Sequence, residues 1–186
     1  YKKEYNLIDF NDMILDFTKS DKSPKFDVVF IDEAQDLSLM QWDMARSIWN
    51  KTEDAFIAGD DDQAIFKWAG AHVDSFIALK DQMINLPLIQ SHRIPIKVHQ
   101  LAMGIINRIK HRIDKTWQPK TSEGSLHRHF GIESINMSSG EWLVLARTKH
   151  MLREIEDVLH RKGLYYETRH KRSYEKDIQE AAQDWE

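Results

Sequence analysis

Two adjacent carboxylates, Asp32 and Glu33, directly follow the apolar run Val28–Ile31. A short continuous run of this kind, rich in β-branched and aromatic residues, is typical of a strand buried on both faces of a parallel sheet. Ligands bind outside the carboxyl ends of strands in open α/β sheets. Two carboxylates are costly there unless a metal or a substrate meets them, so the pattern predicts an active site.

A second group of polar side chains follows a second apolar run. Residues 55–58 are apolar and lead into the segment Gly59-Asp60-Asp61-Asp62-Gln63. Between the two runs, Ser38 and Gln41 have the spacing of a capping box and predict the start of a helix. Strand, helix and strand in this order form a βαβ unit, so both polar groups are expected at one edge of a parallel sheet.

The chemistry that fits these residues is nucleotide hydrolysis. Asp32 can hold Mg²⁺, whose shell favours carboxylate, water and phosphate oxygens. Glu33 can polarise an attacking water, and Gln63 can orient groups around a terminal phosphate. Arg93 is a candidate for neutralising charge on the transferred phosphoryl group. A surface ion pair is an equally good interpretation of Arg93 on its own.

Further elements are expected downstream. Residues 85–89 and 141–146 are strand candidates, and Pro95 suits the first turn of a helix. Residues 110–125 are basic and irregular, which indicates a surface loop. A helix that follows residue 149 is expected to stop at Gly163.

Composition narrows the class of protein. The chain has 186 residues, no cysteine and a net charge of −4. Its apolar runs are too short for a membrane span or a signal peptide, so a cytoplasmic location is expected. Residues 1–92 carry 9 basic against 17 acidic side chains, whereas residues 93–186 carry 17 against 13. This asymmetry suggests an acidic metal-handling half beside a basic half that faces an anion, although two ordinary solvated faces would give the same totals.

Four ordered motifs resemble those of the superfamily 1 helicases of the UvrD/Rep type. Residues 32–36 (Asp-Glu-Ala-Gln-Asp) resemble the Walker B motif, and residues 59–71 resemble motif III. Residues 91–95 are similar to motif IV, and residues 143–148 to the strand that follows it in the second RecA-like domain. The similarity spans about residues 7–168. It implies an α/β fold with the RecA-like parallel sheets and flanking helices of P-loop NTPases, in which residues 1–92 and 93–186 are parts of two RecA-like domains.

The resemblance also implies residue roles, with ATP and Mg²⁺ as cofactors. Asp32 would bind Mg²⁺, and Glu33 would activate water. Gln35 and Gln63 would couple the nucleotide state to the DNA site, and Arg93 would be the arginine finger of the second domain. The implied nucleotide-binding residues are Asp32, Gln35, Asp60 and His92, the last standing where the family often has a tyrosine stacked on adenine.

The implied polymer substrate is single-stranded DNA or a junction of single- and double-stranded DNA. Phe66 and Trp68 match the aromatics on which the family stacks bases, and such stacking tolerates any base sequence. Arg147 and Lys149 match positions that contact the DNA backbone. The location implied is the bacterial cytosol, at the nucleoid or in a virus-infected cell.

Two departures from the family pattern qualify the expected activity. Ala69 stands where the family usually has arginine, and no Gly-x-x-x-x-Gly-Lys-Ser/Thr phosphate loop occurs among the seven glycines. The chain is therefore expected to be an internal piece of a longer helicase, inactive alone and dependent on the remainder of that chain. The alternatives are a non-catalytic DNA-binding module on a helicase scaffold and a P-loop ATPase unrelated to nucleic acid, which the aromatics of motif III disfavour.

Overall fold

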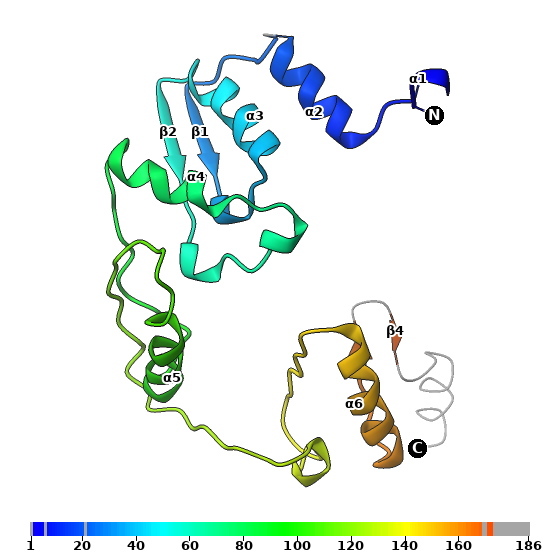
Figure 1. Cartoon of the computed structure of the whole chain (residues 1–186). Coiled ribbons are helices and arrows are strands. Elements are labelled where there is room, and N and C mark those ends of the chain that lie inside the picture. The colour runs from blue at the N-terminus through cyan, green and yellow to red at the C-terminus, as the bar shows by residue number, and fades with distance from the viewer. Residues whose placement is uncertain (1, 6, 21, 169–170, 173–186) are drawn as a thin grey trace, which may run out of the picture. The chain divides into compact units, whose positions relative to one another are not determined.

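The computed structural model describes residues 2–5, 7–20, 22–168 and 171–172. It is a mixed α/β structure with a small parallel sheet (Figure 1). The helices are α1 (Lys2–Tyr5), α2 (Phe10–Lys19), α3 (Leu39–Trp49), α4 (Val73–Ala78), α5 (Ile96–Ile106) and α6 (Lys149–Arg161). The strands are β1 (Val28–Ile31), β2 (Asp54–Ile57), β3 (Glu167–Thr168) and β4 (Lys171–Arg172). The 3-10 helices are η1 (Ala34–Asp36), η2 (Asp61–Gln63), η3 (Lys67–Ala69), η4 (Leu79–Asp81) and η5 (Ile132–Ser134).

The parallel sheet is formed by β1 and β2. The register aligns Val28 with Asp54 and Ile31 with Ile57, so both strands end at the same edge. Helix α3 connects them, and the predicted capping box is present: Gln41 N–H donates to the Ser38 side chain, and Ser38 N–H donates to the Gln41 side chain. The predicted strand, helix and parallel strand are therefore confirmed.

The prediction that β1 is buried on both faces is wrong. Exposure alternates along the strand, with Phe30 77% exposed while Val29 and Ile31 are half-buried. Phe30 instead stacks on Phe56 of β2 with ring centroids 5.0 Å apart. Among the described residues no element covers that face of the sheet, so half of the apolar side chains of β1 stay in contact with solvent.

A compact core lies on the other face of the sheet. Its centre is formed by Ala34, Trp42 and Leu79, which are at most 8% exposed. The half-buried apolar residues packed around them are Ile31, Leu37, Trp49, Ile57, Phe76 and Met83. This core binds β1, β2, α3 and α4 together directly behind the edge where the strands end.

Two strand predictions are wrong. Residues 85–89 form no strand, and only Gln90 makes an isolated bridge, to Gln118. Residues 141–146 also form no strand, and Leu143 is 84% exposed. A strand requires a neighbour that satisfies its backbone hydrogen bonds along its length. In the described part of the chain, residues 85–89 receive only one such bond, from Gln118 N–H to the Ile89 carbonyl, and residues 141–146 make none.

The remaining predicted helices are confirmed. Helix α5 begins at Ile96, directly after Pro95, which is its N-cap and not a residue of its first turn. Gly163 lies just beyond α6 with φ +65°, a conformation that ends helices and favours glycine. No helix in the described residues is both long and apolar enough to cross a membrane.

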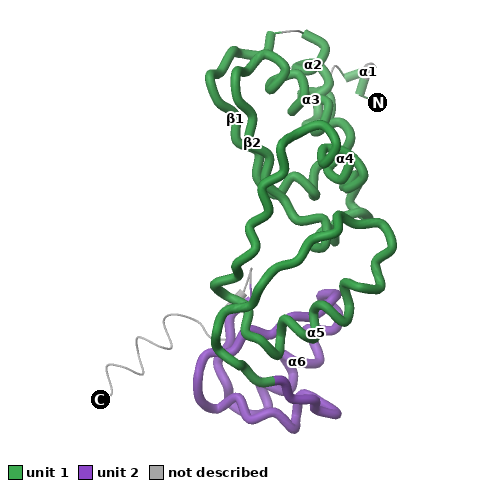
Figure 2. The backbone as a smooth tube through the Cα atoms, turned by 90° about the vertical axis from the view of Figure 1, so that its left-hand side faces the viewer, with its two compact units in different colours: residues 1–125 green, residues 126–186 purple. Residues whose placement is uncertain are grey.

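The chain divides into two compact units, residues 1–125 and 126–186, coloured green and purple in Figure 2. The first contains the parallel sheet, α5 and the basic loop after α5. The second contains α6 and the small antiparallel pair β3–β4. The assignment of residues 1–92 and 93–186 to two RecA-like domains stays a prediction.

Candidate active site

The candidate site lies at the carboxyl edge of the β1–β2 sheet. Two backbone hydrogen bonds close this edge: Ala58 N–H donates to the Ile31 carbonyl (2.8 Å), and Ala34 N–H donates to the Ala58 carbonyl (3.0 Å). They hold the residues after β1 beside the residues after β2. The convergence expected from the strand order is therefore present.

Glu33 occupies an unusual backbone conformation at this edge. Its φ of 51° and ψ of 39° are in the left-handed region, and it is the only non-glycine residue with positive φ in the described chain. Its N–H donates to Asp32 Oδ1 at 2.9 Å. Non-glycine residues in this region carry strain of about 1 kcal/mol or more and are concentrated at functional sites. The carboxylates of both Asp32 and Glu33 remain exposed to solvent.

Gln35 is the buried link between the two strand ends. It is 1% exposed, and both ends of its amide are bonded. Its Nε2 donates to Glu33 Oε2 at 2.7 Å, and its Oε1 accepts from the Asp60 N–H at 3.0 Å. Gly59 makes room for it, because a Cβ there would lie 2.7 Å from Gln35 Oε1 and 2.9 Å from the Phe76 ring. Position 59 therefore has to be glycine if the Gln35 amide is to occupy this place.

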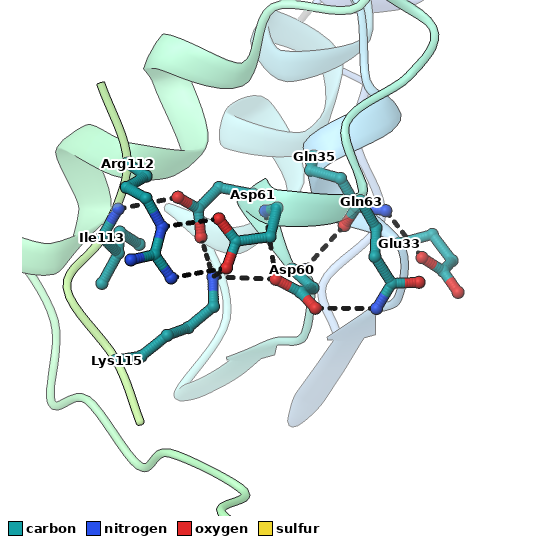
Figure 3. A network of polar contacts seen from close by, with 9 residues as sticks. Glu33, Gln35, Asp60, Asp61, Gln63, Arg112, Ile113 and Lys115 are labelled. Atoms are coloured by element: carbon teal, nitrogen blue, oxygen red, sulfur yellow. Dashed lines mark hydrogen bonds and ion pairs between the residues drawn. The ribbon is translucent and has the colours of Figure 1, made fainter. Parts of the chain in front are cut away.

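Asp60 connects Gln63 to this link. The Asp60 side chain caps η2 by accepting from the Asp62 N–H, and its Oδ2 accepts from Gln63 Nε2 at 2.7 Å. Four predicted site residues, Glu33, Gln35, Asp60 and Gln63, are thus joined by hydrogen bonds (Figure 3).

Two cations that sequence reasoning missed complete the site. Arg112 donates from Nε and Nη2 to the two carboxylate oxygens of Asp62, both at 2.7 Å. Lys115 Nζ lies 2.8 Å from Asp60 Oδ1 and 3.2 Å from Asp62 Oδ2, and it also contacts the Asp61 carboxylate. Both cations belong to the segment expected to be a surface loop. The sequence feature that could have indicated these cations is charge, because residues 93–128 carry eight basic side chains and only two acidic ones.

The cations determine the ionisation of their partners. Burial acts to raise the pKa of Asp62, but the hydrogen bonds from Arg112 and the charge of Lys115 outweigh it and hold that pKa below its usual value. Burial acts to lower the pKa of Lys115, but its bonds to Asp60 and Asp61 outweigh it and raise the pKa. Hydrogen bonding to Asp62 likewise raises the pKa of Arg112. All three groups are therefore charged at neutral pH.

Other predicted site residues are not brought into this network. The side chains of His92 and Arg93 are exposed and make no hydrogen bond or ion pair with any described residue. Phe66 and Trp68 lie beyond η2 with ring centroids 6.4 Å apart and are 42% and 84% exposed. Arg147 and Lys149 belong to the second unit and are also exposed.

The donor set fits a magnesium ion bound mainly by water and phosphate. Asp32 is exposed at the strand end, and only its Oδ1 accepts a hydrogen bond in the described structure. The described residues contain no group of three or more histidine, aspartate or glutamate ligands that could enclose a metal. Mg²⁺ is commonly held by one or two carboxylates together with substrate phosphates and water, which this edge can offer.

Comparison with known proteins supports the resemblance. Residues 1–84 match the family model of the UvrD/REP helicase N-terminal domain. The chain is 28% identical to the ATP-dependent DNA helicase Rep of Buchnera aphidicola from Acyrthosiphon pisum, over 68% of this chain and 21% of the relative. It is 25% identical to the ATP-dependent DNA helicase PcrA of Bacillus subtilis, over 86% of this chain and 26% of the relative.

A third relative is also named as a DNA helicase. The chain is 29% identical to a probable DNA helicase II homologue of Rickettsia felis, over 63% of this chain and 20% of the relative. The chain thus spans about a fifth to a quarter of the length of these relatives. The predicted resemblance to UvrD/Rep-type helicases is confirmed.

Proposed function

We propose that this chain, whose residues 1–84 belong to the UvrD/Rep helicase family, is part of an ATP-dependent motor that moves along single-stranded DNA. The observation that carries the proposal is the hydrogen-bonded chain from Glu33 through Gln35 and Asp60 to Gln63 at the ends of two parallel strands. The parallel pair β1–β2 is consistent with the RecA-like P-loop fold that the family implies. Because the chain spans a minor share of its relatives, the activity is proposed for the complete gene product.

In the proposed reaction, Glu33 acts as the general base. Its Oε2 accepts from Gln35, which fixes the carboxylate while leaving Oε1 without a partner among the described residues. A carboxylate held in this way can accept a proton from a water aligned with the terminal phosphate of ATP. Asp32 would hold Mg²⁺ with phosphate oxygens and water, and the ion would supply charge neutralisation when bound.

The other nucleotide-facing roles follow the family pattern. Gln63 would orient groups around the terminal phosphate, with Asp60 holding its amide. Arg93 would stabilise charge on the transferred phosphoryl group, and His92 would stack on the adenine. The exposure of both side chains leaves them free to meet a nucleotide.

DNA binding is proposed for the exposed aromatics after η2. Trp68 is 84% exposed, so its ring contributes little to the core. A large aromatic ring exposed to water offers a surface on which a base can stack. Phe66 lies beside it, and Arg147 and Lys149 would contact phosphates. The neighbouring backbone is held firmly, because His72 N–H donates to the Leu37 carbonyl at 2.8 Å.

The decisive experiment is Glu33→Gln in the complete gene product. General-base catalysis contributes about 10²- to 10⁴-fold, so DNA-stimulated ATP hydrolysis should fall by about that factor while nucleotide binding survives. Glu53→Gln is the matched control, since Glu53 is an exposed glutamate on the turn before β2. Retained turnover in Glu33→Gln would remove Glu33 as the base. A wild-type protein that binds single-stranded DNA without ATPase would instead support the non-catalytic binding module.

Trp68→Ala tests the polymer substrate. Loss of one stacking aromatic should weaken single-stranded DNA binding by about 1–3 kcal/mol, measured by fluorescence anisotropy. Trp142→Ala is the control, because Trp142 is 54% exposed but lies outside residues 59–71, which resemble motif III. Equal affinities for wild type and Trp68→Ala would favour an ATPase unrelated to nucleic acid.

A further inference from the structure

Arg112, Ile113 and Lys115 form a clamp on the acidic triplet Asp60–Asp62. Each member donates to a carboxylate: Arg112 to Asp62 through two bonds, the Ile113 N–H to Asp61 at 2.7 Å, and Lys115 to the whole triplet. The donors lie about fifty residues from the acceptors in sequence. This clamp joins the loop after α5 to the residues after β2 within the first unit.

The clamp is almost dry. The side chains of Asp61 and Asp62 are 1% and 3% exposed, and those of Arg112 and Lys115 are 13% and 22% exposed. Buried charges are tolerated only when they are paired and hydrogen-bonded, so these groups have few alternative arrangements. The two-pronged Arg112–Asp62 contact adds a fixed orientation. The clamp therefore defines the position of Asp60 and its neighbours closely.

Beyond the clamp, Asp60 continues the network toward the proposed base. Lys115 binds its Oδ1, Gln63 donates to its Oδ2, and its N–H donates to Gln35 (Figure 3). Gln35 in turn donates to Glu33 Oε2. An uninterrupted path of hydrogen bonds and ion pairs thus leads from Lys115 to both Gln63 and Glu33.

On its other side, the clamp is tied to the segment that carries Arg93. Ser91 N–H donates to the Gln118 carbonyl at 2.8 Å, and Lys120 N–H donates to the Ile94 carbonyl at 2.9 Å. These bonds flank Arg93 on both sides and involve the extended stretch just after Lys115. A displacement of the Arg93 segment is therefore expected to displace Lys115 with it.

We propose that Lys115 and Arg112 are positioning residues, which set the orientation of Glu33 and Gln63 through Asp60 and link it to the segment that carries Arg93. This inference rests on the proposed function, because it assigns a role in ATP hydrolysis. Neither cation touches the nucleotide; each acts through the carboxylates of the triplet. A clamp that only stabilises the loop would leave turnover by the folded protein unchanged.

The test is Lys115→Met in the complete gene product, followed by steady-state ATPase assays with saturating single-stranded DNA. Misplacement of a catalytic group lowers the rate of the chemical step, so kcat should fall about ten- to a hundredfold while KM for ATP changes less than about twofold. Lys115→Arg, which keeps the charge, should recover most of kcat. Lys97→Met is the matched control, because the side chain of Lys97 makes only an exposed ion pair with Glu123 among the described residues.

A second measurement separates positioning from folding. Hydrogen exchange should show a faster Asp60 amide in Lys115→Met, since its bond to Gln35 depends on the position of Asp60. If Lys115→Met does not fold, Arg112→Lys takes its place: it keeps the charge but loses the two-pronged contact, and kcat should fall about three- to tenfold. Wild-type kcat in a folded clamp variant would overturn the inference. A wild-type protein without ATPase would instead overturn the proposed function.

Discussion

The carboxylates after β1 and those after β2 lie at the same sheet edge but have opposite surroundings. Asp32 and Glu33 are exposed, and each keeps one oxygen without a partner among the described residues. Asp61 and Asp62 are buried and are saturated by Arg112, Lys115 and a backbone N–H. The first pair is therefore available for chemistry, whereas the second is committed to holding the site together.

The comparison shows that carboxylates at the same sheet edge can have different roles. A free carboxylate at a strand end can bind a metal or accept a proton. A carboxylate with its oxygens already paired in a dry environment would have to break those bonds first, at a cost of several kcal/mol. Asp60 stands between the two classes, because it contacts Lys115 and yet holds the functional amides of Gln35 and Gln63.

The largest effect on stability is expected from Asp62→Ala. Removing this carboxylate leaves the Arg112 guanidinium, 13% exposed, without its charge partner, which should destabilise the first unit by roughly 3 kcal/mol. Urea denaturation monitored by tryptophan fluorescence measures the change. Arg112→Met paired with Asp62→Leu should recover part of the loss, and a wild-type midpoint for Asp62→Ala would show that the pair is dispensable.

Gly59→Ala should have the next largest effect. The new methyl group would lie 2.7 Å from Gln35 Oε1 and 2.9 Å from the Phe76 ring, and overpacking of this kind costs about 1–3 kcal/mol. It should also disturb the Gln35–Asp60 bond that joins the two groups of carboxylates. Gly104→Ala in α5 is the control, because a methyl group added there would meet nothing within 4 Å and alanine favours the helix. In the same denaturation assay, Gly59→Ala should therefore lower the free energy of unfolding, whereas Gly104→Ala should raise it.

A moderate effect of pH is expected, and it should come from the buried groups of the clamp. The pKa of Asp62 is lowered in the folded protein, so its contribution is present above the unfolded value of about 4 and is lost as pH falls through the folded pKa. The pKa of Lys115 is raised, so its contribution is present below about 10.4 and is lost as pH rises through the folded pKa. Denaturation midpoints across pH should fall at both limits, and Asp62→Asn should flatten the acid side.

The smallest effect on stability is expected from Asp32→Asn. Asp32 is exposed, and its side chain bonds only the neighbouring N–H among the described residues, so the free energy of unfolding should change by no more than about 0.5 kcal/mol. Magnesium-dependent nucleotide binding by the complete gene product should nevertheless weaken. A large loss of stability without a change in that binding would reverse the contrast between the two groups of carboxylates.

Much of the local structure could be predicted from the sequence. The start of α3 follows from Ser38 and Gln41, which bond each other three residues apart. The placement of Asp32 and Glu33 beyond β1 follows from the abrupt end of an apolar run. Such features depend on contacts between near neighbours, so the sequence around them contains the necessary information.

Other features of the site were beyond the reach of sequence patterns. Residues 110–125 look like an ordinary basic loop, yet Arg112 and Lys115 reach acids some fifty residues away. Residues 141–146 look like a buried strand, yet Leu143 is 84% exposed because no neighbouring strand pairs with them in the described chain. Whether a residue pairs at long range depends on which segments the fold brings together.

The sequence by itself determined which residues end the two strands, where the capped helix begins, and the resemblance of residues 1–84 to the N-terminal domain of UvrD/REP helicases. The tertiary structure decided which carboxylates are free and which are clamped. The physical reason is that identical aspartates differ only in their surroundings: water leaves Asp32 available for a ligand, whereas burial beside Arg112 and Lys115 commits Asp62 to an ion pair.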